Sequence, residues 1–480
     1  MKNVMLIYPP GIMYQRGEDR CQINIEASAA NSLRACNDLG YAAAILRKGG
    51  YNVFLKDYMA EKADFEILKT DIEREKADAI FISITNGSIF EDIKITEKIK
   101  NIFPNVKIIL KGALFFNPEE SLFKELNLNF TDVLIGGETE FIISPLFNAI
   151  FNSQEKLKDI EGICYKINDK WIENKVNHFE DNLDSIPFPA RDLMKNHLYI
   201  NPLTNKPIAT ISTSRGCPSS CIYCVSPLIS GKKVRFRSVK NVFDEIKECV
   251  DKYNITDFFF KSDTFTINKN WVMELCSLII NSDLKNRINW AANSRVNTID
   301  DEMLQKMKEA GCYLIALGLE SGSNESLLKM GKGTSVEQNI FAVKLIKKYK
   351  IKIWGFYLIG FPWETKKHLK ATRKLMFKLN TDFIELSVAT PFKGSKLYKM
   401  IYKNAPNREQ VLGKDSFKHI TKGTEYLTAK ELKNFRKNTL LLYHIRPCFI
   451  LKKLTDTNIT FDLLRNYLKF GIKMLKNSLF

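Results

Sequence analysis

Apolar and polar positions alternate along the chain in two long series of strand-like and helix-like segments. In the first series, residues 32–48 and 91–102 show helical periodicity between short apolar runs. The predicted strands cover residues 4–8, 51–56, 80–83, 106–110 and 133–135. Strands that alternate with helices predict a doubly wound, Rossmann-like parallel sheet covered on both faces. Ligands of such sheets bind at the carboxyl ends of the strands.

A second alternating series begins at residue 208 and contains six strand–helix units. Its predicted strands cover residues 209–211, 257–260, 288–291, 314–317, 352–358 and 383–388. Six such units predict an α/β fold of the partial (β/α)6 barrel type, with its chemistry at the carboxyl ends of the strands. The predicted organisation is a Rossmann-like domain (1–150), a linker with a small hairpin (151–205), a barrel (206–395) and a basic helical extension (396–480).

The composition is that of an ordinary globular protein. Of the 480 residues, 45% are hydrophobic and 26% are charged, which excludes intrinsic disorder and low-complexity classes. No apolar run is long enough for a transmembrane helix, and Pro9 and Pro10 end the first apolar run too early for a signal peptide. We therefore expect a cytoplasmic protein.

Positive charge is concentrated near the carboxyl end. The net charge is +18, and residues 395–480 hold 18 basic and 6 acidic residues, a net of +12. Such a field suits nucleic acid, an anionic membrane or an acidic substrate, but a solvated lysine-rich helical surface explains it equally well. In residues 461–479, leucine and other apolar residues recur at helical spacing beside four basic residues. We expect this stripe to pack on the barrel, with peripheral contact to anionic lipid as the alternative.

Three of the ten cysteines are clustered, at Cys217, Cys221 and Cys224 in the loop after the first barrel strand. The other seven are scattered, as buried structural cysteines usually are. A zinc site would need a fourth ligand, and no other Cys or His lies in the loop. Three thiolates with one open position suit an iron–sulfur cluster, and a structural zinc knuckle is the alternative.

This Cys-x3-Cys-x2-Cys loop, with Tyr223 before its last cysteine, resembles the radical S-adenosylmethionine (SAM) enzymes. The resemblance continues through residues 235–238, 260–266, 294–296, 318–323, 355–365 and 391–395. Together with the segment 187–192, these motifs resemble the branch that has an amino-terminal cobalamin-binding domain. The resemblance covers residues 1 to about 400.

The resemblance implies a cofactor set and a site. Cys217, Cys221 and Cys224 would hold a 4Fe–4S cluster whose open iron binds SAM, and an external donor would supply the electron. Cleavage of SAM would give a 5′-deoxyadenosyl radical that abstracts a hydrogen atom from the substrate. The SAM-binding candidates are Tyr223, Ser262, Asp263, Arg295 and Glu320. For Asp263 and Glu320 a helix-capping role is the alternative.

The amino-terminal segment departs from the cobalamin-binding pattern of this branch. Asp57 fits the Asp-x-His-x-x-Gly loop, but Met59 stands at the histidine position and Lys62 at the glycine position. No imidazole is therefore available there as an axial ligand. The remaining cobalamin-binding candidates are Ser83, Thr85, Gly112, Gly136, Gly137 and Glu138. We expect cobalamin to bind without a protein axial ligand; a docking domain without a corrinoid is the alternative.

The favoured activity is cobalamin-dependent C-methylation of an unactivated carbon in a small-molecule or lipid-like substrate. The alternatives are a cyclase or ring-rearranging oxidoreductase of the same branch, and a cobalamin-free radical SAM enzyme. A nucleic-acid-modifying methylthiotransferase would carry three further cluster cysteines near the amino terminus. The spacing of Cys21, Cys36 and Cys164 does not fit that pattern, so nucleic acid is not the expected partner.

Overall fold

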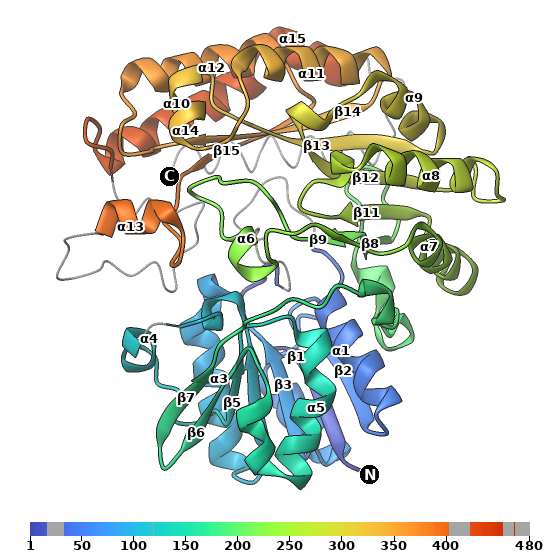
Figure 1. The fold of residues 1–480 in the computed structure, drawn as a ribbon, viewed down its shortest axis with the longest axis vertical. Coiled ribbons are helices and arrows are strands. Elements are labelled where there is room, and N and C mark those ends of the chain that lie inside the picture. Colours follow the sequence, from blue (N-terminus) through green and yellow to red (C-terminus); the bar gives the residue numbers. More distant parts are fainter. Residues whose placement is uncertain (17–32, 119, 403–422, 455–464, 466–480) are drawn as a thin grey trace.

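The computed structural model describes residues 1–16, 33–118, 120–402, 423–454 and 465. These residues form two large sheets, a mixed one in the amino-terminal half and a parallel one in the second half, and Figure 1 shows the amino-terminal half below the second half. The predicted fold class, a Rossmann-like domain followed by a partial barrel and a helical extension, is confirmed.

The amino-terminal sheet has seven strands in the order β2-β1-β3-β4-β5-β6-β7. Its parallel strands are β1 (Asn3–Tyr8), β2 (Asn52–Asp57), β3 (Ala79–Ser83), β4 (Lys107–Lys111) and β5 (Val133–Ile135). A central strand such as β3 is completely buried because helices cover both faces of the sheet. Apolar residues therefore fill both faces. The helices of this half are α1 (Asn37–Lys48), α2 (Phe65–Glu75), α3 (Ile89–Ile102), α4 (Glu120–Glu125) and α5 (Thr139–Asn152).

The hairpin that the sequence places in the linker is part of this sheet. Its strands β6 (Ile163–Ile167) and β7 (Lys170–Asn174) run antiparallel, and β6 pairs with β5. The sheet therefore continues beyond residue 150, because the buried side of β6 extends the apolar core. The connection that follows contains single turns of 3-10 helix and the buried Arg191, which forms an ion pair with Glu245 of the barrel at 2.5 Å.

The second sheet has six parallel strands in the order β15-β14-β13-β12-β11-β8, so β8 and β15 are its open edges. The strands are β8 (Ile208–Ser212), β11 (Asp257–Lys261), β12 (Asn289–Arg295), β13 (Cys312–Glu320), β14 (Lys352–Ile359) and β15 (Phe383–Val388). The short strands β9 (Ser214–Arg215) and β10 (Arg235–Phe236) pair beside the cysteine loop. Outer helices are α7 (Val239–Tyr253), α8 (Lys269–Ile280), α9 (Asp301–Glu309), α10 (Asn324–Lys329), α11 (Val336–Lys348) and α12 (Lys366–Leu379).

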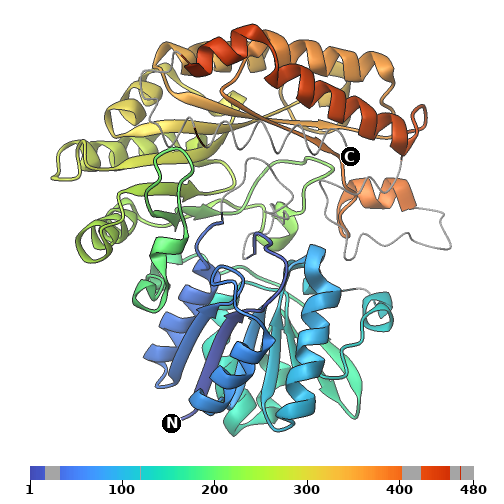
Figure 2. The same ribbon diagram turned by 180° about the vertical axis from the view of Figure 1, so that it is seen from behind.

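The described part of the extension is helical, as predicted. It contains α13 (Lys396–Tyr402), α14 (Ala429–His444) and α15 (Pro447–Leu454). Figure 2 shows α14 and α15 along the outside of the barrel, on the side away from the amino-terminal domain. The predicted apolar and basic helix of residues 461–479 lies outside the described residues, apart from Arg465.

Candidate active site between the two sheets

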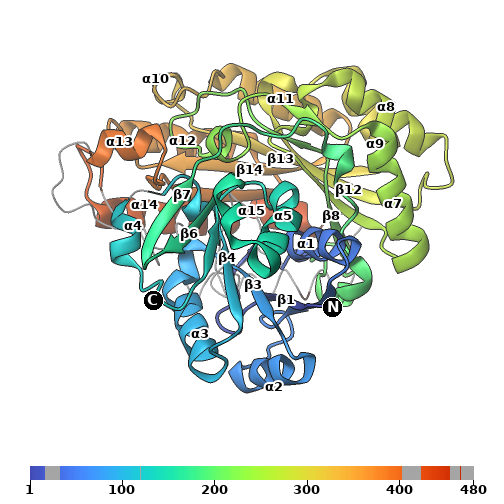
Figure 3. The same cartoon turned by 60° about the horizontal axis from the view of Figure 1, so that its bottom comes forward.

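One cavity of about 450 Å³ is lined by both halves of the chain. The amino-terminal half contributes residues at the carboxyl ends of its strands, including Lys111, Gly136 and Gly137. The barrel contributes residues of all six strands and of the cysteine loop. Figure 3, in which the amino-terminal domain comes forward, shows the barrel strands behind it. The carboxyl ends of both sheets thus face a shared space, as parallel folds of both types predict.

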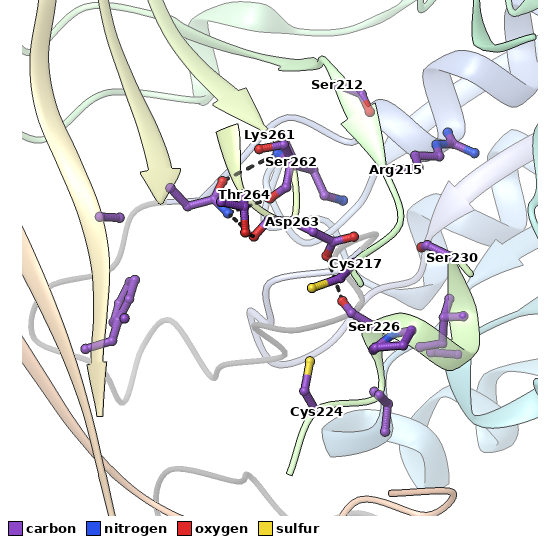
Figure 4. Close-up of a pocket in the computed structure, with 18 of the residues that line it drawn as sticks. Ser212, Arg215, Cys217, Cys224, Ser226, Ser230, Lys261, Ser262, Asp263 and Thr264 are labelled. Carbon is purple, nitrogen blue, oxygen red and sulfur yellow. Dashed lines mark hydrogen bonds between the residues drawn. The ribbon is translucent and has the colours of Figure 1, made fainter. Parts of the chain in front are cut away.

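The cysteine loop is held at the edge of this cavity by backbone contacts. Gly216 has φ +95°, and a Cβ there would lie 2.0 Å from the Lys233 carbonyl oxygen, so the turn requires glycine. The Cys217 amide donates to the Gly231 carbonyl at 3.0 Å. All three cysteines line the cavity, and Figure 4 shows Cys217 and Cys224 directed into it.

The three thiols line the same cavity, but they do not converge on a common metal position. Among the described residues, no group of three His, Cys, Asp or Glu side chains has the arrangement of a metal site. The segment around the cysteines has no regular secondary structure that would fix the thiols. The donor set, three soft ligands on a short loop, fits an iron–sulfur cluster, whose binding would gather the loop around it.

Tyr223 and Arg295 lie beside this loop. The Tyr223 ring packs edge-on against Phe361, with centroids 5.7 Å apart. Burial and the nearby Glu320 carboxylate raise the pKa of Tyr223 well above its usual value, so it stays a neutral phenol. Arg295 directs Nη1 toward the Cys221 sulfur at 3.7 Å and donates from Nη2 to the Lys332 carbonyl. A fixed cation is therefore placed next to a candidate cluster ligand.

Ser262 and Asp263 follow β11 directly and also line the cavity. The Ser262 hydroxyl is buried and has no hydrogen-bond partner among the described residues. An orphaned hydroxyl of this kind suits a polar ligand group, because leaving it unpaired costs about 1–3 kcal/mol. Asp263 accepts a hydrogen bond from Ser226 at 2.8 Å, which Figure 4 shows across the loop. Asn268, not Asp263, caps the following helix α8.

Glu320 occupies a strained position at the end of β13. Its φ is +57°, and the pairing of β13 with β14 shifts register between Gly318 and Glu320. A non-glycine residue in this conformation costs roughly 1–3 kcal/mol, which is typical of functional sites. The carboxylate is buried and forms an ion pair with Lys332 at 2.6 Å. Ser323 caps the following helix α10, so Glu320 is not a cap either.

Glu138 and Glu140 join the two halves of the molecule at the start of α5. Glu138 forms a two-point ion pair with Arg235, with distances of 2.7 and 2.9 Å. Glu140 accepts two hydrogen bonds from Arg215, at 2.5 and 3.1 Å. Burial alone would raise the pKa of Glu140, but Arg215 outweighs it and lowers the pKa to about 2. The candidate Glu138 lines the cavity, and it also forms an ion pair with Arg235 of the barrel half.

The candidates Ser83, Thr85 and Gly112 lie in the amino-terminal core and not on the cavity wall. The Ser83 hydroxyl donates to Asp38 at 2.6 Å, and the Thr85 hydroxyl is buried without a partner among the described residues. A Cβ at Gly112 would lie 2.8 Å from the side chain of Ile84, so this glycine serves close packing.

A buried polar network underlies that wall, and the sequence motifs give no sign of it. Asp38 accepts hydrogen bonds from Tyr8 at 2.5 Å and from Ser83, and it lies 3.5 Å from Lys111. Tyr8, Asp38 and Lys111 all line the cavity. Asp38 lies at the start of α1, far from Ser83 and Lys111 in sequence, so only the assembled sheet reveals the cluster.

The region where an axial histidine would stand is closed. Met59 is buried, and its sulfur accepts a hydrogen bond from Arg16 Nε at 3.2 Å. Arg16 is itself buried in a two-point ion pair with Asp92. Asp57 accepts from Tyr199 at 3.1 Å, and burial raises the pKa of Asp57 to about 6.

Further cavity residues were not predicted from the sequence, namely Arg34, Asn293, Lys332, Trp354, Phe356 and Glu385. Trp354, Phe356 and Glu385 alternate with core residues along predicted strands, which was an available signal for a barrel interior. Among the described residues, no helix has the length and apolarity required to cross a membrane.

Comparisons with known proteins agree with this architecture. Residues 211–376 match the model of the radical SAM superfamily. An uncharacterized methyltransferase of Pyrococcus horikoshii is 30% identical over 87% of this chain and 89% of its own length. The anaerobic magnesium-protoporphyrin IX monomethyl ester cyclase of Rubrivivax gelatinosus is 27% identical over 75% of this chain and 65% of its own.

A solved structure supports the fold over the whole chain. It is the radical SAM methyltransferase TsrM of Kitasatospora setae, determined with cobalamin and a 4Fe–4S cluster bound. It superposes with a TM-score of 0.70, covering 99% of this chain and all of its own, at 16% sequence identity. At that identity the match establishes the shared fold.

Proposed function

This chain belongs to the radical SAM superfamily, whose members use a 4Fe–4S cluster and SAM, and we propose that it is a cobalamin-dependent methyltransferase. The observation that carries the proposal is the single cavity shared by the cysteine loop and the strand ends of the amino-terminal sheet. A methyl donor and a radical source must act on one substrate atom, so both cofactors need access to one space. The relative from Pyrococcus horikoshii, a named methyltransferase, aligns over both halves.

The residues of the barrel would hold the cluster and SAM, and those of the amino-terminal sheet would hold the corrinoid. Cys217, Cys221 and Cys224 would hold the cluster, whose chemistry when bound is to deliver the electron that cleaves SAM. Ser262 and Asp263 would hold polar groups of SAM, with the orphaned Ser262 hydroxyl as the first contact. Arg295 would bind the SAM carboxylate, and Glu320 its hydroxyls.

The amino-terminal side would seat the corrinoid at the strand ends. Gly136 and Gly137 lie on this wall, where a Cβ at Gly136 would strike the Phe115 backbone, and Tyr8, Asp38 and Lys111 would supply polar contacts. Ser83, Thr85 and Gly112, which lie behind that wall, would support it from the core. The buried Met59 fits a corrinoid without a protein axial ligand. Glu138 and Glu140, through their ion pairs with Arg235 and Arg215, would fix the distance between the two cofactor sites.

Cyclisation is the second candidate, because a named cyclase aligns over 75% of this chain. Both activities begin with SAM cleavage, so the fate of the methyl group separates them. The test is anaerobic, reductant-driven turnover of protein loaded with cobalamin, using SAM labelled in its methyl group. We expect label to leave SAM and appear in the corrinoid fraction. Formation of 5′-deoxyadenosine with all label retained in methionine would contradict methyl transfer.

A further inference from the structure

A carboxylate lies inside the barrel, below the candidate SAM site. Glu385 is on β15 and lines the cavity. Its Cα is paired in register with Phe356 of β14, which is paired with Gly318 of β13, and both also line the cavity. Glu320 lies two residues beyond Gly318 toward the strand end. Glu385 is therefore one layer deeper in the barrel than the strand-end residues assigned to SAM.

The surface around this carboxylate is aromatic and mostly apolar. Trp354 and Phe356 contact each other with ring centroids 5.2 Å apart, and Phe259 and Ala316 complete the wall. Gly318 contributes no side chain opposite Phe356, and the Glu320–Lys332 ion pair lies where its Cβ would stand. The Trp354 indole nitrogen is buried and has no hydrogen-bond partner among the described residues. An apolar wall with a few convergent polar groups is typical of small-molecule sites.

Glu385 lacks a strong internal partner. Its Oε1 accepts a hydrogen bond from Ser387 at 3.2 Å, and no cation of the described residues lies within ion-pair distance of it. The charged groups that act on it are Arg34 and Arg436. Arg34 lies on the Phe259 ring at 4.1 Å, and Arg436 donates to the Leu386 carbonyl at 2.6 Å. Burial raises the pKa of Glu385 to about 7 in spite of both cations and of Ser387.

Glu385 is half-buried, and a carboxylate that faces an apolar wall without a paired cation is typical of sites where a ligand supplies the missing partner. We propose that Glu385 anchors a substrate that carries a basic nitrogen, such as an amine, amidine or guanidine, on a flat apolar body that packs on Trp354 and Phe356. This inference rests on the proposed function, because it names the substrate class of the same cavity. The anchor would hold the substrate body in the barrel and leave its far end directed at the cofactors.

The test uses three probes of nearly equal size and shape: benzamidine, which is cationic, benzamide, which is neutral, and benzoate, which is anionic. Binding to the full-length, anaerobically purified protein is measured by calorimetry or ligand-observed NMR. We expect benzamidine to bind at least about tenfold more tightly than benzamide, the factor of one charge-assisted hydrogen bond, and benzoate to bind least. Glu385→Gln should remove the preference, whereas Glu302→Gln, which changes an exposed carboxylate, should keep it.

The acidity of Glu385 provides a second readout. Affinity for benzamidine should rise between pH 6 and pH 8, through the pKa of about 7, because the carboxylate becomes charged. Arg34→Gln should strengthen benzamidine binding by removing a competing cation. Equal binding of the three probes, or a preference that survives Glu385→Gln, would overturn the inference. Corrinoid and iron contents are measured on the same samples, so a preference without bound corrinoid would contradict the proposed function and leave the anchor standing.

Discussion

The two walls of the cavity are built in different ways. On the barrel side, the cysteine loop, Tyr223, Ser262, Asp263, Arg295 and Glu320 all line the cavity, and Arg295 reaches the Cys221 sulfur. On the amino-terminal side, Gly136, Gly137 and Glu138 line it, while Ser83, Thr85 and Gly112 lie behind it. Cluster and SAM chemistry requires particular donor atoms at particular points. A large flat ligand requires mainly space, and many sequences can provide that.

Loss of a cluster cysteine should have the largest effect on activity. We expect Cys217→Ser to lose the cluster and all 5′-deoxyadenosine formation, because a hydroxyl is a poor ligand for iron in this setting. Iron and sulfide analysis with a reductant-driven SAM cleavage assay measures both. Cys448→Ser, at an exposed cysteine outside the cavity, is the matched control. A Cys217→Ser protein with full iron content would refute the assignment.

The junction between the walls should be the next most sensitive place. Arg215→Met leaves the buried Glu140 without its cation, and we expect a loss of about 3–5 kcal/mol in the free energy of unfolding. Lys240→Met, which removes an exposed pair with Asp244, should cost less than about 0.5 kcal/mol. Urea denaturation compares the two variants. Equal losses in the free energy of unfolding would show that the Arg215–Glu140 pair does not stabilise the contact between the two halves.

The same junction predicts an acid dependence of stability. Because folding lowers the pKa of Glu140 from 4.5 to about 2, its contribution is present above pH 4.5 and is lost as the pH falls toward 2. The shift corresponds to about 3 kcal/mol. In Glu140→Gln this part of the pH dependence should be missing.

A smaller effect is expected at the strained end of β13. Glu320→Gln keeps the shape but removes the charge, and SAM affinity should fall about tenfold through the loss of one charge-assisted hydrogen bond. Equilibrium binding of SAM to the cluster-loaded protein measures it. An unchanged affinity would mean that Glu320 does not contact SAM and only forms the ion pair with Lys332.

The smallest effect is expected on the amino-terminal wall. Met59→Leu conserves volume in the core and should leave corrinoid content and its visible spectrum unchanged, because Met59 does not line the cavity. A changed spectrum would mean that the thioether reaches the corrinoid.

The contrast between the walls also explains what the sequence could predict. Both alternating series predicted the parallel strands of their sheets, since burial on both faces of a parallel sheet leaves a strong local pattern, whereas the antiparallel β6 and β7 were assigned to the linker. The cysteine loop was recognisable because its spacing is local. The pairing of Glu140 with Arg215 and the cluster of Asp38 with Ser83 and Lys111 join residues far apart in sequence, so no local pattern encodes them. Glu385 alternates with core residues along its strand, which is a signal for the barrel interior, but its place opposite Phe356 follows only from the assembled sheet.

If one cavity serves both cofactors, the corrinoid and the cluster must occur together in the same molecules. Anaerobic purification with hydroxocobalamin and reconstitution of the cluster, followed by gel filtration, gives the corrinoid and iron contents of the same molecules. We expect about one corrinoid and about four irons per chain. A protein that keeps its iron and binds no corrinoid would contradict this expectation, and the amino-terminal sheet would then be a docking domain.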